Sequence, residues 1–478
     1  MDADLRADAE AIITGLPVSL EMPAGTGKTQ LVAAIAAIAE ETGKKTLVLT
    51  HTHAGVDAIR GRLQKFGVSP RNVHIDTITG WAFDLVRSYP VIAGIQVPPE
   101  PDWSKSADYI AGAIQVAQSR AVREMHEVSF DYFIVDEYQD CNDQQHDFIL
   151  AIAEAVPKTC VFGDRLQGIF DFRGQKLVDW DTQVFARFPL HPQTHVPHRW
   201  QGHNEELGQW LLDLRPTLLV SGSIDLSAVT LTGYSWAQRD AADPSALVTA
   251  ALASHPEGES VLVLAQWPND ADALARDLRG MYSVMEDIQG RFMLTFLTTV
   301  DEGPATTYPQ LVAQFAKNCF IGLASLDRAV LDKLAAGQTV GHLTRAGLEA
   351  VLASLDTLIA NPTLSELAST MTTIESTAGI KLFKREAWTD VRKAVESASQ
   401  ANTPTVSSLA RIRDALRHSG RRPAKRVVSR TLLVKGLEYD HVIIADASGF
   451  QTSRNLYVAL TRARKTLTVF STNAVVRY

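Results

Sequence analysis

The feature that most constrains the fold is a glycine-rich turn that joins an apolar run to a helical pattern. The run Val18–Glu21 has the composition of a buried strand, and Thr29–Thr42 repeats apolar residues at helical spacing before Gly43. Between them, Gly25 and Gly27 let backbone N–H groups approach an anion closely, and the following helix adds the positive end of its dipole. This order of strand, turn and helix predicts a phosphate-binding loop in an α/β domain.

The remaining residues of the turn indicate which phosphates it binds. The loop reads Gly25-Thr26-Gly27-Lys28-Thr29, in which Lys28 can reach the terminal phosphates of a nucleoside triphosphate and Thr29 can ligate magnesium. The strict pattern has glycine where Met22 stands, so the loop is a variant. We therefore expect these five residues to bind ATP, with Mg²⁺ as the accompanying ion.

Strand-like runs recur at both ends of the chain. Most are continuously apolar, which is typical of strands buried on both faces of a parallel sheet. We therefore predict an α/β fold with two tandem parallel-sheet domains and helical insertions. The runs are Val18–Glu21, Thr46–Thr50, Tyr132–Val135, Thr159–Phe162, Val261–Ala265, His441–Ala445 and Leu467–Phe470.

Two stretches interrupt this rhythm of strands and helices. Residues 88–129 are rich in proline and then helical in pattern, which predicts a small insertion, whereas the Leu/Ala-rich residues 291–420 predict a larger helical one. The expected division is residues 1–200 for the first domain, and 201–290 with 421–478 for the second. The basic run from Arg417 to Arg430 marks the return to the second domain, as a solvated linker or as a phosphate contact.

Composition narrows the class of protein. A net charge of −8 argues against a surface coated in positive charge, although a local basic groove remains compatible with it. Cys141, Cys160 and Cys319 are too few and too far apart for a disulfide framework, which favours a reducing cytoplasm. The apolar runs fall short of the roughly 20 residues of a membrane span, and the acidic start Met1–Asp4 is unlike a secretory signal.

An acidic pair follows one of the buried runs. Asp136 and Glu137 come directly after Tyr132–Val135, and ligands of parallel sheets bind at the carboxyl ends of strands. Asp136 is then placed to hold Mg²⁺ through water, and Glu137 to orient or deprotonate an attacking water. On its own such a pair is as often a solvated loop, but the phosphate-binding loop upstream favours catalysis.

Four longer motifs resemble those of the UvrD/Rep-type superfamily 1 helicases. They follow the phosphate loop in the family's order and, with it, span residues 22 to 463. Residues 136–140 (DEYQD) resemble motif II, residues 163–174 (GDRLQGIFDFRG) motif III, residues 435–440 (KGLEYD) motif V and residues 456–463 (LYVALTRA) motif VI. The resemblance implies two RecA-like domains with ATP bound between them.

The resemblance also implies roles at the nucleotide. Arg462 resembles the arginine that reaches across the cleft to the γ-phosphate, and Arg199 resembles a second one from motif IV. Gln167 resembles the residue that couples the γ-phosphate to the strand site, and Glu438 a motif V residue near the sugar. The alternatives are a surface salt bridge for Arg462 and a helix-end charge for Arg199.

The strand-binding residues are implied in the same way. Phe172 and Arg173 resemble the aromatic–arginine pair of motif III that stacks a base and grips the strand, and stacking tolerates any base. Trp81, in residues 77–81, resembles the aromatic of another strand-contacting motif, and His51 falls where motif Ia lies. For Trp81 and Phe172, plain core packing is the alternative.

The chain departs from the family pattern in several places. Residues 1–20 lack the glutamine that usually reads adenine, so selectivity for ATP over other nucleotides is in doubt. His198 stands where motif IV usually has a larger aromatic, and Leu432 where motif V usually has histidine. The two insertions are shorter than those of full-length relatives, which puts strand-separating power in doubt.

The sequence thus predicts an ATP-dependent 3′→5′ helicase or translocase that moves on single-stranded DNA or tailed duplexes. Two alternatives stay open: a translocase that does not unwind, and a nucleotide-gated DNA-binding subunit of a nuclease or anti-phage complex. In its length and general build, this chain resembles small helicases that are paired with nucleases, such as the Gabija helicase subunit. Four histidines between His191 and His203 lack the convergent spacing and cysteine partners of a zinc site.

Overall fold

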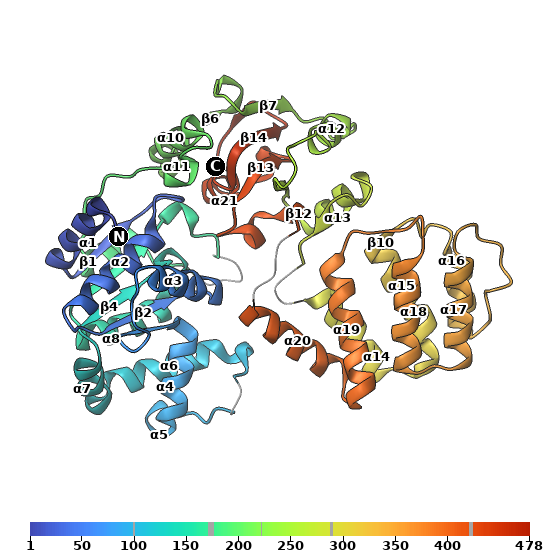
Figure 1. The fold of residues 1–478 in the computed structure, drawn as a ribbon, viewed down its shortest axis with the longest axis horizontal. Helices are drawn as coiled ribbons and strands as arrows, with labels where there is room; N and C mark the ends of the chain where they lie inside the picture. The colour runs from blue at the N-terminus through green and yellow to red at the C-terminus, as the bar shows by residue number, and fades with distance from the viewer. Residues whose placement is uncertain (99–100, 171–175, 221, 287–289, 420–423) are drawn as a thin grey trace.

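The computed structural model describes the chain except residues 99–100, 171–175, 221, 287–289 and 420–423 (Figure 1). Its first half is a five-stranded parallel sheet in the order β1-β5-β4-β2-β3. The strands are β1 Val18–Glu21, β2 Thr46–Thr50, β3 Val73–Thr77, β4 Tyr132–Val135 and β5 Thr159–Gly163. The helices are α1 Ala3–Gly15, α2 Lys28–Glu41, α3 His53–Lys65, α4 Ile78–Ser88, α5 Pro90–Ala93, α6 Ser106–Gln118, α7 Arg120–Ser129 and α8 Asp143–Ala155.

Both faces of this sheet are buried, which explains why its strands read as continuous apolar runs. Leu47 and Leu49 of β2 pack with α4, α6 and α8, whereas Val48 between them packs with α1, α2 and α3. Successive side chains of a strand point to opposite faces, so a strand covered on both sides needs no polar residues. Because β1, β5 and β4 are paired in parallel, their carboxyl ends meet at one edge of the sheet.

The second half is a six-stranded parallel sheet in the order β7-β14-β13-β8-β12-β9. Its chain segments lie far apart in sequence, so the green and red ribbons interleave at the top of Figure 1. The strands are β7 Tyr234–Gln238, β8 Val261–Ala265, β9 Ser283–Val284, β12 Arg426–Arg430, β13 Tyr439–Ile444 and β14 Ala463–Ser471. The helices are α10 Glu205–Asp213, α11 Arg215–Leu219, α12 Ser245–Ala251, α13 Pro268–Asp277 and α21 Ser453–Leu460, and β6 Ile224–Asp225 pairs antiparallel with β15 Val475–Val476.

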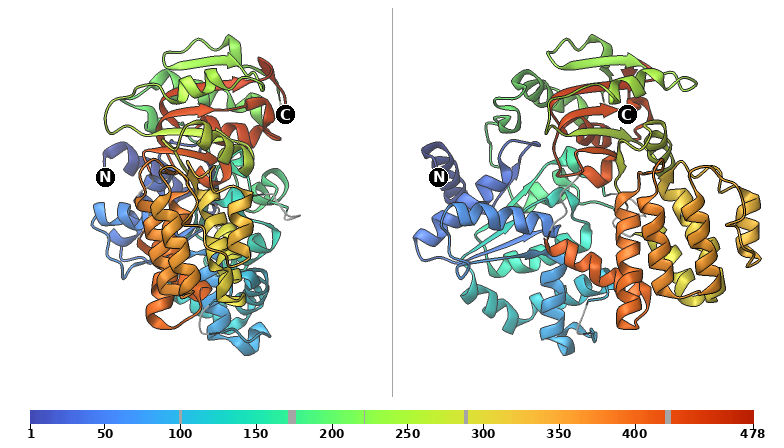
Figure 2. Two further views of the ribbon diagram at one scale, coloured as in Figure 1. Left: turned by 90° about the vertical axis from the view of Figure 1, so that its right-hand side faces the viewer. Right: turned by 45° about the vertical axis from the view of Figure 1, so that its right-hand side comes forward.

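A helical region with its own core lies between β9 and β12 in sequence. Phe315, Leu355 and Trp388 are buried in that core, and Figure 2 shows the region standing beside the two sheets. Its last helix, α20, extends back toward α3 of the first half. The elements are α14 Arg291–Glu302, α15 Tyr308–Cys319, α16 Arg328–Ala335, α17 Glu349–Ala360, α18 Leu364–Ser376, α19 Arg385–Ala401, α20 Thr405–Ser419 and the antiparallel pair β10 Phe320–Ile321 with β11 Lys381–Leu382.

The two parallel sheets confirm the predicted α/β class, and each of the seven predicted strands is present. The helix after the phosphate loop is Lys28–Glu41, one residue earlier than predicted at both ends. One interpretation was wrong: part of the basic run is no linker, because Arg426–Arg430 forms β12, with Val427, Val428 and Ser429 buried. The division into domains with two insertions stays a prediction.

In the described part of the chain, none of the helices combines the length and apolar character that crossing a membrane requires.

Candidate functional site

The glycine-rich loop between β1 and α2 has a backbone that only glycine adopts readily. Gly25 and Gly27 have φ of 75° and 90°, in the left-handed region. A Cβ on Gly25 would lie 2.7 Å from Cβ of Arg199 and 2.7 Å from the ring of Trp200. Glycine is thus required at Gly25 both by the turn and by close packing against the segment His198–Trp200.

The loop also offers backbone donors for an anion. Among the described residues, no acceptor is recorded for the N–H groups of Gly27, Lys28 and Thr29, which open the first turn of α2. The first N–H groups of a helix have no partner within it and lie at the positive end of its dipole. This arrangement fits a phosphate group, and it is the observation on which the nucleotide expectation rests.

Asp136 and Glu137 lie at the carboxyl end of β4, next to the loop. Lys28 Nζ is 3.3 Å from Asp136 Oδ1 and also forms an ion pair with Glu137. Glu137 has φ of 58°, and a left-handed backbone at a residue other than glycine is most common at functional sites. Gln139 donates a second hydrogen bond to the Glu137 carboxylate.

Mutual attraction within the cluster of Lys28, Asp136 and Glu137 opposes the effect of burial on their pKa values. Burial alone would lower the pKa of Lys28, but Asp136 and Glu137 outweigh it and raise that pKa. Burial opposes ionisation of Glu137 as well, yet Lys28 and Lys435 lower its pKa to about 2. The pKa of Asp136 is raised, because burial outweighs the attraction of Lys28. Glu137 is therefore a carboxylate at neutral pH.

Arg199 reaches from the loop to the second sheet. Its backbone N–H donates to Gly25 O at 3.1 Å, while its side chain donates to Glu438 Oε1 at 2.9 Å and to Thr461 O at 2.6 Å. It lies in the one-turn 3₁₀ helix His198–Trp200 rather than at the end of a longer helix. Arg199 and Glu438, predicted separately, are thus brought into contact.

Arg462 is completely buried. Its guanidinium donates to Val458 O at 2.8 Å, to Leu437 O at 2.9 Å and to Thr461 Oγ1 at 2.9 Å. Within the described residues Arg462 forms no ion pair, so the surface salt bridge considered as an alternative is wrong. Burial and the neighbouring Arg199 lower its pKa to about 9, against the attraction of Glu438, so Arg462 remains a cation at neutral pH.

Two family models match the chain. Residues 102–178 match the UvrD/REP helicase N-terminal domain, and residues 433–470 match the UvrD-like helicase C-terminal domain. Two segments of the chain are thus similar to UvrD/Rep-type helicases. The matched residues include the segments predicted as motifs II, III, V and VI, and the matches indicate a helicase-type motor protein.

Other comparisons add little to this UvrD/Rep-type assignment. The crystal structure of Pif1 helicase from Candida albicans is similar over 100% of this chain and 97% of its own, with 11% identity and a TM-score of 0.40. A likeness of that extent carries no argument here. A search of the curated proteins found no match.

Gln167, in the segment that resembles motif III, lies in a buried polar network. Gln167 Nε2 donates to Asp164 Oδ2 at 2.9 Å, and Asp164 Oδ1 accepts from Arg215 at 2.8 Å. Arg215 also pairs with Glu21 at the end of β1 and with the hydroxyl of Tyr457 in α21. The network therefore ties motif III to both halves of the molecule.

Sequence reasoning missed the contact made by Lys435. Its Nζ lies 2.6 Å from Asp140 Oδ1 and 2.6 Å from Gln167 O, so motif V of the second half is bound to motifs II and III of the first. Asp140 is the last residue of the segment that resembles motif II, and Lys435 is the first of the segment that resembles motif V. Their opposite charges were the only hint of this contact in the sequence.

Of the four predicted strand-binding residues, the structure describes Trp81 and His51. Phe172 and Arg173 lie outside the described residues. Trp81 packs in an aromatic cluster with His74, at a ring-centroid distance of 4.8 Å, and with Phe130 at 6.2 Å, which fits the core-packing alternative. His51 turns inward, its Nε2 3.2 Å from Cys141 Sγ, and burial and Lys435 lower its pKa to about 3.

Proposed function

We propose that the protein hydrolyses ATP to move 3′→5′ along single-stranded DNA, as a helicase or translocase. One observation carries the proposal. The glycine loop, the acidic pair and Arg199 are linked by direct contacts that reach both halves of the chain. Lys28 pairs with Asp136 and Glu137, and Arg199 is bonded to Gly25 O on one side and to Glu438 and Thr461 O on the other. A phosphate between them would touch groups from both sheets, which is what coupling of hydrolysis to domain movement requires.

The residues around Lys28 suggest how hydrolysis proceeds. Lys28 is paired with Glu137, so its transfer to a terminal phosphate would leave Glu137 free to orient and deprotonate water. Thr29 and Asp136 would hold Mg²⁺, which when bound neutralises phosphate charge in the transition state. Lys435, which also lowers the pKa of Glu137, would still favour its ionised form after Lys28 has moved.

The two arginines suggest how closure depends on the nucleotide. Arg462 is a buried cation that forms no direct ion pair among the described residues, and a γ-phosphate would supply one. Arg199 is hydrogen-bonded to Glu438 and to Thr461 O of the second half. A movement of the loop segment that carries Arg199 would therefore be transmitted to the second half. Both arginines would stabilise charge that develops during phosphoryl transfer.

The strand-binding part of the proposal rests on the motifs. Phe172 and Arg173, with Trp81 and His51, are proposed to contact the strand, and Gln167 to couple it to the nucleotide. Polarity and DNA as the substrate follow from the family resemblance alone. Service to a nuclease partner or in anti-phage defence remains an alternative that no contact in the structure favours.

The test is ATPase and unwinding on duplexes with 3′ or 5′ DNA tails, and with RNA tails. Lys28→Ala should lose nucleotide binding, whereas Glu137→Gln should bind nucleotide but turn over about 10²–10⁴-fold more slowly. Lys44→Ala is the control, because Lys44 is an exposed lysine paired with Asp131 on the surface.

The outcomes separate the alternatives. Strand-stimulated ATPase with unwinding of the 3′-tailed duplex supports the helicase, and stimulation without unwinding supports a translocase. ATP binding with no turnover on any strand would leave only a nucleotide-gated binding subunit and would contradict the proposal.

A further inference from the structure

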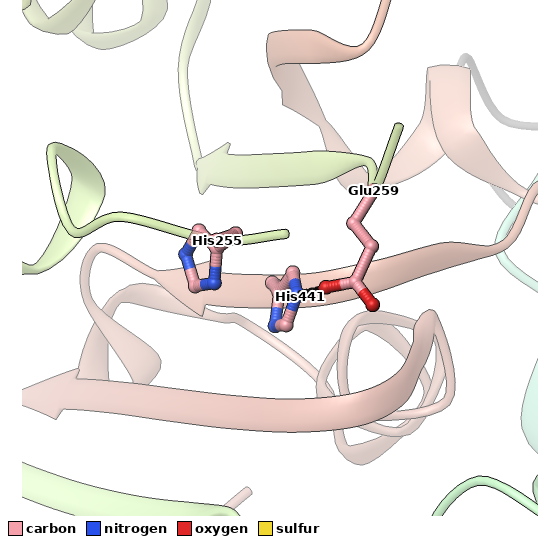
Figure 3. A group of neighbouring side chains, drawn as sticks. All are labelled: His255, Glu259 and His441. Atoms are coloured by element: carbon pink, nitrogen blue, oxygen red, sulfur yellow. Dashed lines mark hydrogen bonds and ion pairs between the residues drawn. The ribbon is translucent and has the colours of Figure 1, made fainter. Parts of the chain in front are cut away.

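A group of possible metal ligands lies in the second half, outside the nucleotide site. His255 and Glu259 stand on the loop between α12 and β8, and His441 stands on β13 beside β8 (Figure 3). One ligand atom from each lies within 4.8 Å of the others. Glu259 and His441 are 182 residues apart in sequence. The parallel pairing of β8 and β13 brings their two segments together.

The hydrogen bonds of His441 orient it as a metal ligand would be oriented. Its Nδ1 is 2.8 Å from Thr466 Oγ1 on the neighbouring strand β14, and its Nε2 is 2.6 Å from Glu259 Oε2. A second partner that fixes one ring nitrogen and leaves the other facing the site is the usual support of a ligating histidine. His441 is buried, so the orientation is held by the sheet.

His255 supplies an unsatisfied nitrogen. Its ring stacks on that of His441 with centroids 3.7 Å apart, and within the described residues its buried Nε2 has no hydrogen-bond partner. A buried polar atom without a partner costs free energy. Coordination of a cation would remove that cost, whereas stacking alone does not.

The charges around the group are compatible with a cation. Glu259 uses its Oε1 for Lys465, so among the described residues its Oε2 is shared only with His441. Lys465 also lies 3.5 Å from Asp440 Oδ1. The carboxylates of Glu259 and Asp440 thereby offset the charge of Lys465, and Glu259 opposes the effect of Arg426 on His255.

We propose that His255, Glu259 and His441 bind a divalent transition-metal ion of the Zn²⁺ class. Two imidazoles and a carboxylate are a ligand set that zinc takes, with water as a fourth ligand. A tetrahedral ion places its ligand atoms roughly 3.3–3.5 Å apart. The pair at 2.6 Å must open and the widest pair at up to 4.8 Å must close, and the exposed loop that carries His255 and Glu259 can supply both shifts. The bound ion would tie this loop to the sheet.

The test is binding of Co²⁺ and Zn²⁺ to the full chain, after dialysis against a chelator and in excess Mg²⁺ to fill the acidic pair. Visible absorption reports tetrahedral Co²⁺, and competition gives the affinity for Zn²⁺. We expect one equivalent, an unfolding temperature raised by Zn²⁺, and binding weakened at least about tenfold in His255→Ala, Glu259→Gln and, through the lost support of His441, Thr466→Val.

The matched control is His342→Ala, which removes an exposed histidine of the helical region and should leave binding unchanged. The three test variants alter surface-near groups or conserve shape, so circular dichroism should show them folded. No tetrahedral Co²⁺ signal in the wild type, or a signal that His255→Ala and Glu259→Gln leave intact, would overturn the proposal. The readout is metal binding, so it does not depend on whether the chain hydrolyses ATP.

Discussion

Lys435 Nζ lies 2.6 Å from Asp140 Oδ1, in a buried ion pair that binds the second half of the molecule to the first. Removal of one partner of a buried pair costs about 3–5 kcal/mol, because the other charge stays desolvated. That cost falls on the docked arrangement, since undocking returns Asp140 to water. We therefore expect Lys435→Met, which keeps most of the apolar stem, to lower strand-stimulated ATPase with little loss of nucleotide binding.

A double-mutant cycle separates the pair from its surroundings. Lys435→Met combined with Asp140→Asn should cost less than the sum of the single changes, because the second change removes a charge that the first left unpaired. Steady-state ATPase at saturating nucleotide and strand measures all four corners of the cycle. Strict additivity would mean that Lys435 acts through Gln167 O alone.

The same pair predicts a pH dependence. Burial raises the pKa of Asp140 to about 7, against the attraction of Lys435. Asp140 is thus ionised above that pH and accepts the Lys435 bond, and protonation as the pH falls through about 7 removes the pair. We expect strand-stimulated kcat to fall from pH 8 to pH 6 with an inflection near 7. Asp140→Asn should lose this inflection, and Lys435→Met should move any remaining one to higher pH.

A substitution of Arg462 can distinguish a catalytic role of this buried side chain from a purely structural one. Arg462→Lys keeps a cation but loses the fork that donates to four oxygens. If the arginine contacts the γ-phosphate, kcat should fall about 10³-fold or more while nucleotide affinity changes little. Rapid-quench ATPase and nucleotide titration measure the two quantities, with the exposed Arg328→Lys as control. A lowered unfolding temperature with normal kcat would mark Arg462 as structural only.

The strands that the sequence predicted are mostly buried on both faces, whereas two of those that it missed, β3 and β7, are partly exposed. In β3, His74 is exposed between the buried Val73 and Ile75, and the edge strand β7 has no fully buried residue. Short runs of this kind resemble loops. The prediction of two parallel sheets succeeded because central parallel strands carry an apolar signal along the chain.

The site was predictable only where its residues are neighbours in sequence. The loop Gly25–Thr29 and the pair Asp136 and Glu137 are local patterns with their own chemistry. The contacts between halves join residues 239 positions apart for Arg199 with Glu438, and 295 apart for Lys435 with Asp140. Periodicity and spacing carry no information over such separations, so these pairs follow only from the fold.

Gly43, at the end of α2, is a control for Gly25 in the loop, because it shares the left-handed backbone but not the close packing. Both have φ near 70–75°, but a Cβ on Gly43 would meet nothing within 4 Å, whereas one on Gly25 would clash with Arg199 and Trp200. Gly43→Ala should therefore cost only the strain of a left-handed alanine, about 1–2 kcal/mol. Gly25→Ala should cost more and also weaken nucleotide binding, because Arg199 must move from the junction.

Denaturant unfolding and titration with a fluorescent ATP analogue measure these two effects. The informative quantity is the difference between the variants, since strain from the left-handed backbone is common to both. Equal stabilities with unchanged nucleotide affinity in both variants would show that the Gly25 turn is not held against Arg199 in solution. A selective loss of affinity in Gly25→Ala would tie the loop's shape to the segment that reaches the second sheet.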